Sequence, residues 1–260
     1  MSRQGKFSPE TEAKASLLSV LFKKKMLNAN AAIINELPLY KFSRRVDIAL
    51  IDKKIIFFEI KSKSDKLTRL EGQAKAFSYY CDKLIILCAK KHVQNVLKTA
   101  PKCSGIWQLN DDLSISVVRV GKESKLADKE KLIDLVNLDE LRSILRTNGI
   151  KASGKRRKHA VLLAKEIPLT RLRKYILDIL RQRHSKFSQK LISAFSKNKK
   201  IKASDVLALR RRELGRVRSN TKRVDGPTVD DVYLSQLATQ SGGELFGKFP
   251  HSGTKRKTKV

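Results

Sequence analysis

The sequence contains no long apolar run and few of the residues that build zinc sites or disulfide frameworks. No apolar segment is long enough to span a bilayer, and the first six residues, Met-Ser-Arg-Gln-Gly-Lys, lack the apolar core of a signal peptide. The three cysteines show no CxxC spacing, and only four histidines are present. We therefore expect a reduced, intracellular protein of the cytoplasm or nucleoid, with no membrane partner and no zinc site.

Acidic residues are scarce relative to basic ones. The 260 residues include 57 Lys and Arg but only 25 Asp and Glu, which gives a formal net charge of +32. An excess of this size favours a polyanionic partner, most often nucleic acid. The excess is uneven, because residues 150–223 hold 24 basic and 4 acidic side chains. The sequence thus indicates a moderately charged N-terminal domain followed by a C-terminal region that binds a polyanion.

The N-terminal half alternates between helical and extended hydrophobic patterns. The predicted elements are a helix over 9–25, a strand over 31–39, a hairpin over 46–60, a helix over 67–80, a strand over 83–89, a helix over 92–98 and strands over 105–109 and 113–120. This order predicts an α/β domain with a mixed sheet flanked by helices, covering residues 1–120.

The C-terminal half shows no alternation typical of strands. Residues 121–131 are charged and predict a linker, and helical patterns then continue over 132–217 as an all-α basic extension. Ser, Asn, Thr, Gly and Lys dominate residues 218–260, so we expect a largely disordered basic tail.

Three charged residues of the predicted hairpin are placed so that they could act together. Asp47 opens the first strand, Glu59 interrupts an otherwise apolar return strand, and Lys61 follows two residues later. Because strand side chains alternate in direction, Glu59 and Lys61 point to the same face. Two carboxylates and an ammonium at one strand end can bind a divalent cation and activate water. The alternative interpretation is the solvated rim of an ordinary sheet.

The same residues resemble the PD-(D/E)XK nuclease superfamily. Asp47, then Glu59-Ile60-Lys61 at the end of the next strand, then Gln73 in the following helix match its pattern, with Val46 in place of the expected proline. The resemblance covers residues 10–95 and is to an uncharacterised bacterial and phage-type branch. It implies a restriction-endonuclease-like fold and an Mg²⁺-dependent DNA endonuclease in which Mn²⁺ substitutes.

The resemblance also implies a role for each residue of the site. The expected metal ligands are Asp47, Glu59 and the backbone carbonyl of Ile60. Lys61 would orient the attacking water or stabilise developing charge. Glu36, with Glu12 as the fallback, would be the first acid and would bind a second metal or its water. Gln73 would position Lys61 or the scissile phosphate.

A second resemblance covers residues 137–167. Leu138, Leu141 and Leu145 have helical spacing, Asn148-Gly149 ends that helix, and four basic residues begin the next one. This pattern resembles a SAP domain, a small two-helix DNA-binding module. The alternative is an ordinary helical hairpin that packs on the nuclease domain.

Basic side chains from both halves are predicted to contact DNA. They are Arg44, Arg45, Arg69, Lys155, Arg156, Arg157, Lys158, Arg171, Arg173, Arg210, Arg211 and Arg212. The expected function is cleavage of DNA directed by structure or by a partner, in transposition, recombination, repair or defence, with a homodimer or a larger nucleoprotein complex as the assembly. The alternatives are a non-catalytic DNA-binding scaffold on a nuclease fold and a basic RNA-binding protein.

Overall fold

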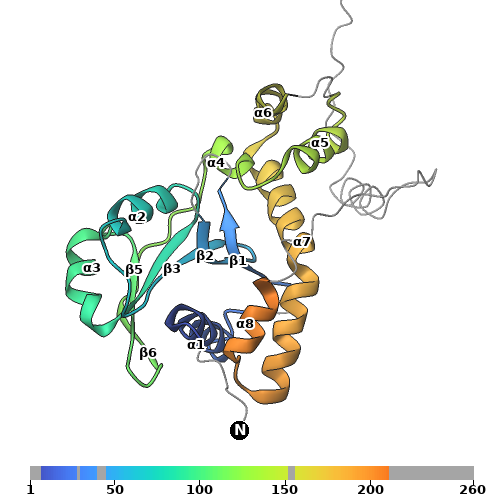
Figure 1. Ribbon diagram of the computed structural model, residues 1–260. Helices are drawn as coiled ribbons and strands as arrows, with labels where there is room; N and C mark the ends of the chain where they lie inside the picture. The colour runs from blue at the N-terminus through green and yellow to red at the C-terminus, as the bar shows by residue number, and fades with distance from the viewer. Residues whose placement is uncertain (1–6, 28–29, 40–44, 152–155, 211–260) are drawn as a thin grey trace, which may run out of the picture. The chain divides into compact units, whose positions relative to one another are not determined.

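The N-terminal half of the chain folds as a sheet with helices on its faces. The computed structural model describes residues 7–27, 30–39, 45–151 and 156–210, all within a unit that extends to Arg218. Its first elements (Figure 1) are α1 (Pro9–Lys23), β1 (Ala32–Pro38), β2 (Arg45–Ile51), β3 (Ile55–Lys61), α2 (Leu70–Ser78), β4 (Lys83–Ala89), the 3-10 turn η1 (Lys90–His92), α3 (Val93–Thr99), β5 (Gly105–Leu109) and β6 (Ile115–Arg119). The predicted tail over 218–260 lies outside the described residues.

The six strands form one mixed sheet in sequence order, β1-β2-β3-β4-β5-β6. The first three strands are antiparallel neighbours, β3, β4 and β5 run parallel, and β6 returns antiparallel to β5. The C-terminal ends of the parallel strands β3, β4 and β5 therefore lie at the same end of the sheet. Ligands of open α/β sheets bind at this end of the strands. The predicted class, an α/β mixed sheet flanked by helices and followed by helices, is confirmed.

Helices cover both faces of the sheet except at β6, whose side chains are largely exposed. Phe58 and Ile60 of β3 point to one face and join a buried cluster with Leu18 of α1 and Ile201, which precedes α8. On α2 the side chain of Phe77 is fully buried, and this helix packs on β4. The alternation of apolar side chains along each strand thus places α1 and α2 against the same sheet.

The C-terminal half is helical, as predicted. Its elements are α4 (Lys129–Ile133), α5 (Leu138–Thr147), α6 (Arg157–Lys165), α7 (Leu169–Asn198) and α8 (Ala203–Arg210). The 30-residue helix α7 runs along the β1 edge of the sheet and contacts β1, β2, α4, α5 and α8 (Figure 1). The helical half is therefore packed on the sheet rather than separated from it. Among the described residues, no helix is both long and apolar enough to cross a membrane.

A buried carboxylate ties α7 and the predicted linker to the sheet. Asp82, at the start of β4, accepts hydrogen bonds from the backbone N–H groups of Ile55 (2.7 Å) and Leu126 (2.6 Å). The Arg173 guanidinium of α7 lies 2.5 Å from the same carboxylate, and both side chains are almost fully buried. Ser124 N also donates to the Asp82 carbonyl, so the segment predicted to be a linker follows the sheet closely.

The predicted helical hairpin over 137–167 is present as α5 and α6. Asn137 and Glu140 form a capping box at the start of α5. Gly149 has a φ of 69°, and the N–H groups of Gly149 and Ile150 bond the carbonyls of Arg146 and Leu145, which closes the helix. This left-handed position is the reason for a glycine there. Residues 152–155, the predicted start of the second helix, lie outside the described part of the chain.

Candidate active site

Three carboxylates lie in a row across the first three strands. The paired residues on either side of Glu36 place it opposite Asp47 across β1 and β2, and extending the β2–β3 register by one residue places Asp47 opposite Glu59. Residues directly opposite one another on neighbouring strands have side chains close together. The register therefore puts the backbones of the three acids that the sequence predicted at one level of the sheet, at the end of β3 where Lys61 also lies.

Asp47 reaches across to the backbone of β3. Its Oδ2 accepts a hydrogen bond of 2.6 Å from the backbone N–H of Ile60. The N–H and C=O groups of one strand residue point to the same neighbouring strand, so the Ile60 carbonyl also faces β2. The two carboxylates and the carbonyl predicted as metal ligands are thus adjacent.

Lys61 is held between the strand and helix α2. Phe58 and Ile60 pack toward α1, so the intervening Glu59 and the following Lys61 face α2. The Lys61 Nζ lies 2.7 Å from Glu59 Oε1 and 3.1 Å from Gln73 Oε1. The Lys61 side chain is 11% exposed and that of Glu59 is 2% exposed. Asp47, Glu59, Lys61 and Gln73, predicted as one set, therefore form one cluster.

Burial is the main cause of the raised pKa values of Asp47 and Glu59. Desolvation, and then the charge of Glu59, raise the pKa of Asp47 to about 8, although Lys14 and the Ile60 N–H lower it in part. Burial likewise raises the pKa of Glu59, while the Lys61 ammonium opposes that shift. Glu59 Oε2 is buried, and no donor within the described residues bonds to it. A buried carboxylate oxygen without such a donor is satisfied either by a proton shared with Asp47, whose carboxyl also acts on the pKa of Glu59, or by a positive ligand.

Glu36 has an unusual backbone conformation and contacts two cations. Its φ of 57° lies in the left-handed region, which is uncommon for a non-glycine residue and costs about 1 kcal/mol. Its Oε1 lies 3.5 Å from Lys14 Nζ and its Oε2 lies 3.4 Å from Arg45 Nη1. On α1, Glu10 rather than the fallback Glu12 approaches the site, because it lies 2.8 Å from the same Lys14 Nζ.

Lys14 belongs to this site, although the sequence patterns did not single it out. It is 3% exposed and lies on the buried side of α1. The signal was present: Lys14 precedes Leu17, Leu18 and Leu21 at helical spacing, so it occupies an apolar-stripe position. A lysine at such a position needs a buried partner, which the acids of β1 and β2 supply.

The loop after Lys61 is fixed by a second small network. Asp65 Oδ2 accepts hydrogen bonds from the Ser62 backbone N–H (2.7 Å) and the Ser62 hydroxyl (2.6 Å). The buried His92 places Nε2 3.1 Å from the Ser62 carbonyl. The Asp65 charge also contributes to the raised pKa of Glu59. These residues hold the chain that leaves Lys61 toward α2, a role that sequence patterns did not reveal.

The oxygen atoms at this site determine which kinds of metal ion it can bind. In the part of the chain that the structure describes, no group of three or more His, Cys, Asp and Glu side chains could hold a metal ion. What remains is two carboxylates, one of them with a buried oxygen that lacks a donor, and the Ile60 carbonyl. All are hard oxygen ligands of the kind that Mg²⁺ and Mn²⁺ take, with positions left for water and phosphate.

The predicted DNA-contacting side chains divide into exposed and structural ones. The exposed ones are Arg45, Arg69, Arg156, Lys158 and Arg171. Arg44, Lys155, Arg211 and Arg212 lie outside the described residues, and Arg210 ends α8 with its side chain not described.

Two of the predicted DNA contacts also have partners within the fold. Arg173 is 5% exposed and is paired with Asp82, so its guanidinium is not presented to a phosphate. Arg157 donates to the Ile133 carbonyl at 2.8 Å and lies 4.0 Å from Asp134, which holds α6 against α4. Basic composition alone could not separate these two from their exposed neighbours, because their partners are distant in sequence.

Comparison with known proteins identifies the family. The chain belongs to the family of bacteriophage P4 protein cII, whose model matches residues 3–210. Protein cII of Enterobacteria phage P4 is 29% identical over 204 residues, which is 77% of each chain. A protein of unknown function from Silicibacter pomeroyi is 17% identical with a TM-score of 0.38, over 56% of this chain and 98% of that one.

Proposed function

We propose that this member of the phage P4 cII family is a divalent-metal-dependent DNA endonuclease of the PD-(D/E)XK type. The observation that carries the proposal is the cluster of Asp47, Glu59, Lys61 and Gln73 at one end of the sheet. The order α1, three antiparallel strands, α2 and then β4 parallel to β3 supports it, because the resemblance implies that frame. The phage P4 relative is consistent with a phage or mobile-element setting.

The residues of the site divide the chemistry between them. A bound Mg²⁺ would supply positive charge that neutralises phosphoryl oxygens and activates water for attack. Asp47, Glu59 and the Ile60 carbonyl would hold it, and Asp47 must first release the proton that its raised pKa retains. Burial of these groups keeps competing water away and strengthens each charge interaction.

Lys61 acts on the reacting phosphate. Its ammonium, oriented by Glu59 and Gln73, can donate to the attacking water or to a phosphoryl oxygen that gains negative charge. The Gln73 amide oxygen accepts from Lys61, so Gln73 positions the ammonium rather than reacting itself. The Arg69 side chain is exposed at the start of α2, on the same side of the sheet, and we assign it to the DNA backbone.

Cleavage assays test the proposal directly. Branched, nicked and linear DNA are incubated with the full chain in Mg²⁺ or Mn²⁺, with Lys61→Ala as the inactive variant. Lys98→Ala on α3 is the matched control, because Lys98 is exposed and has no ion pair with the carboxylates of the site. We expect cleavage by the wild type and the control only. If neither metal supports cleavage, or if Lys61→Ala cuts as well as the wild type, the proposal fails.

A second candidate function follows from the small number of acids at the site. A DNA-binding scaffold on a nuclease fold needs no metal, and no group of three or more His, Cys, Asp and Glu side chains among the described residues is placed to hold one. Duplex binding without Mn²⁺ binding would favour this candidate. Equal or tighter binding of structured RNA at the same salt, again without cleavage, would instead favour a basic RNA-binding protein.

A further inference from the structure

The buried Lys14 lies where the row of carboxylates would otherwise gather a second cation. Its Nζ is 2.8 Å from Glu10 Oε1 and 3.5 Å from Glu36 Oε1. Its charge also acts on Asp47, whose pKa it lowers. The Lys14 ammonium therefore interacts with three carboxylates, which come from α1, β1 and β2. The Lys14 side chain is only 4% exposed.

An ammonium and a divalent cation compete for the same oxygens. Both oxygens of Glu36 already face a cation, because Lys14 Nζ lies 3.5 Å from Oε1 and Arg45 Nη1 lies 3.4 Å from Oε2, and a metal bound there would be repelled by these charges at close range. Glu59 differs because the Lys61 ammonium lies 2.7 Å from its Oε1 only, and its buried Oε2 has no donor among the described residues. Glu59 can therefore bind a divalent cation through Oε2, whereas Glu36 cannot do so without displacing a cationic side chain.

We propose that the Lys14 ammonium takes the place of a second metal, so that the site binds one divalent ion, on the Asp47 and Glu59 side. The inference rests on the proposed function, since it concerns the metal of that site. Glu36 then becomes a positioning residue that orients Lys14, and its left-handed backbone turns its carboxylate toward α1.

Metal stoichiometry tests the inference without any assay of activity. Mn²⁺ is titrated into the full chain, free ion is followed by electron paramagnetic resonance, and heat is measured in parallel. We expect one Mn²⁺ for the wild type and for Lys14→Arg, which keeps the charge. Lys14→Gln and Lys14→Met should bind two, with the second site at least tenfold tighter than any further site in the wild type. Lys14→Met suits the apolar stripe of α1, so it guards against a misfolded Lys14→Gln.

Two results would overturn the inference. One is binding of two Mn²⁺ ions by the wild type, and the other is a stoichiometry of one in both uncharged variants when circular dichroism shows them folded. Absence of Mn²⁺ binding in every variant is a different result, because it removes the proposed function together with the inference. Asp47→Asn separates the cases, since it should abolish the single site of the wild type.

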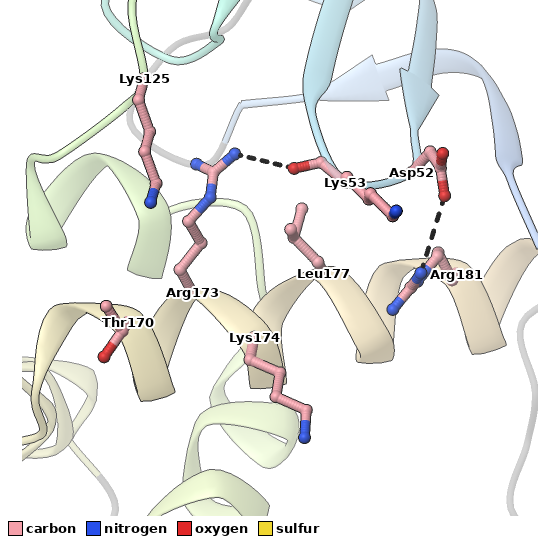
Figure 2. A pocket seen from close by; sticks show the side chains of 8 residues that line it. All are labelled: Asp52, Lys53, Lys125, Thr170, Arg173, Lys174, Leu177 and Arg181. Atoms are coloured by element: carbon pink, nitrogen blue, oxygen red, sulfur yellow. Dashed lines mark hydrogen bonds and ion pairs between the residues drawn. The ribbon is translucent and has the colours of Figure 1, made fainter. Parts of the chain in front are cut away.

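A hollow at the opposite end of β2 and β3 carries a second, independent inference. It has a volume of about 250 Å³ and lies between the β2–β3 turn and the first turns of α7. Figure 2 shows Lys125 and Arg173 extending toward this space from opposite sides, with Lys53 on the turn. Lys174 and Arg181 of α7 also border it, although Figure 2 shows the Lys174 side chain directed away from Lys53 and Lys125, and Asp52 is the one acid among its described lining residues.

The positive charges of this hollow are of two kinds. Arg173 is paired with Asp82, and Arg181 lies 3.8 Å from Asp52. The three lysines are exposed and have no ion pair with any described residue: Lys53, Lys125 and Lys174. Helix α7 begins beside them with no acidic residue in its first turn and no side-chain cap, so its N-terminus adds partial positive charge.

We infer that this hollow binds a phosphate group. It cannot serve the scissile phosphate, because the β2–β3 turn is separated from Glu59 by four residues of β3, or about 13 Å of strand. The phosphate can belong to a polynucleotide backbone that extends from the carboxylate end, or to a free nucleotide. Both sources offer the same chemistry to lysines and a helix N-terminus.

Two probes separate the sources. Inorganic pyrophosphate and a short DNA duplex are titrated into the wild type, into a pocket variant with Lys53, Lys125 and Lys174 changed to Gln, and into a control variant. The control changes three exposed lysines elsewhere to Gln, Lys75, Lys98 and Lys102, so both variants carry the same reduced net charge. Salt is varied for the duplex.

The pocket variant should bind pyrophosphate at least tenfold more weakly, while the control stays within twofold of the wild type. If the source is the DNA backbone, the salt slope of duplex binding also falls by about 1 for each substituted lysine that binds a phosphate, in the pocket variant only. If the source is a free nucleotide, duplex binding changes equally in both variants. Equal weakening in both variants for both probes would overturn the inference.

Discussion

The two ends of the β2–β3 hairpin carry charges of opposite character. At one end Asp47, Glu59 and Lys61 are shielded from solvent and in contact with other polar groups of the chain. At the other end Lys53, with Lys125 from another segment, is exposed and has no ion pair within the described residues. A charged side chain that is buried needs a partner within the fold, because burial removes its hydration. An exposed charged side chain stays hydrated and remains able to bind a ligand.

This difference gives a working rule for a chain with a net charge of +32. A cation that is paired inside the protein stabilises the fold or orders the site, and one that is exposed and unpaired is available for phosphate. Arg173 and Lys174 are neighbours on α7, but Arg173 is buried and paired with Asp82, whereas Lys174 is exposed and has no ion pair within the described residues. Substitutions at such neighbours can break or sharpen the comparison.

The largest expected effect is on stability, from Arg173→Ala. Both Arg173 and Asp82 are buried, so removing the guanidinium leaves a carboxylate without its main charge partner, which costs about 3–5 kcal/mol. Lys174→Ala should change the free energy of unfolding by less than about 0.5 kcal/mol, because Lys174 is exposed. Urea unfolding measures both. Similar values for the two variants would show that burial does not separate the roles of these two cations.

The next effect concerns catalysis at the carboxylate end. Lys61→Ala should lower the cleavage rate by about 10²–10³-fold, because the ammonium is placed to stabilise charge that develops on the phosphate. Gln73→Ala should lower it by about tenfold, since Gln73 only orients Lys61. Single-turnover kinetics at saturating metal give both rates. A larger reduction for Gln73→Ala than for Lys61→Ala would mean that the amide, and not the ammonium, contacts the substrate.

The carboxylate end should also respond to pH. Because burial raises the pKa of Asp47 to about 8, a proton competes with metal below that pH. Mn²⁺ affinity should therefore rise by up to about tenfold per pH unit between pH 6 and pH 8 and level off above. Calorimetric titrations at several pH values measure this slope. A flat profile from pH 6 would mean that Asp47 is already ionised in the metal-free protein.

The sign of the linked stability change follows from the same shift. The pKa of Asp47 rises from an ordinary value of 3.8, so the folded metal-free protein holds a proton that the unfolded chain has released. This contribution to stability is complete below the unfolded pKa and is lost as pH rises through about 8. The thermal stability of the metal-free wild type should thus fall progressively between about pH 4 and about pH 8 and level off above that, and Asp47→Asn should remove that part of the pH dependence.

Much of the fold and part of the site could be predicted because they depend on local periodicity. Alternating apolar residues predicted the strands, and the same alternation put Glu59 and Lys61 on one face, where Gln73 of α2 meets them. The role of Lys14 and the buried pairing of Arg173 were not predicted, since their partners are set by tertiary packing: Arg173 and Asp82 are 91 residues apart. A basic residue looks the same in sequence whether it meets a phosphate or a buried acid.

The smallest effect tests whether the rule extends to α6, in the hairpin that resembles a SAP domain. Arg157 donates to the Ile133 carbonyl, whereas Arg156 and Lys158 on either side of it are exposed. Arg157→Gln should cost about 1 kcal/mol of unfolding free energy and leave the salt slope of DNA binding unchanged. The double variant of Arg156 and Lys158 to Gln should do the reverse, with unchanged stability and a slope lower by up to about 2. If the double variant leaves the slope unchanged as well, this helix does not contact DNA, and the α5–α6 hairpin is a packing element of the fold.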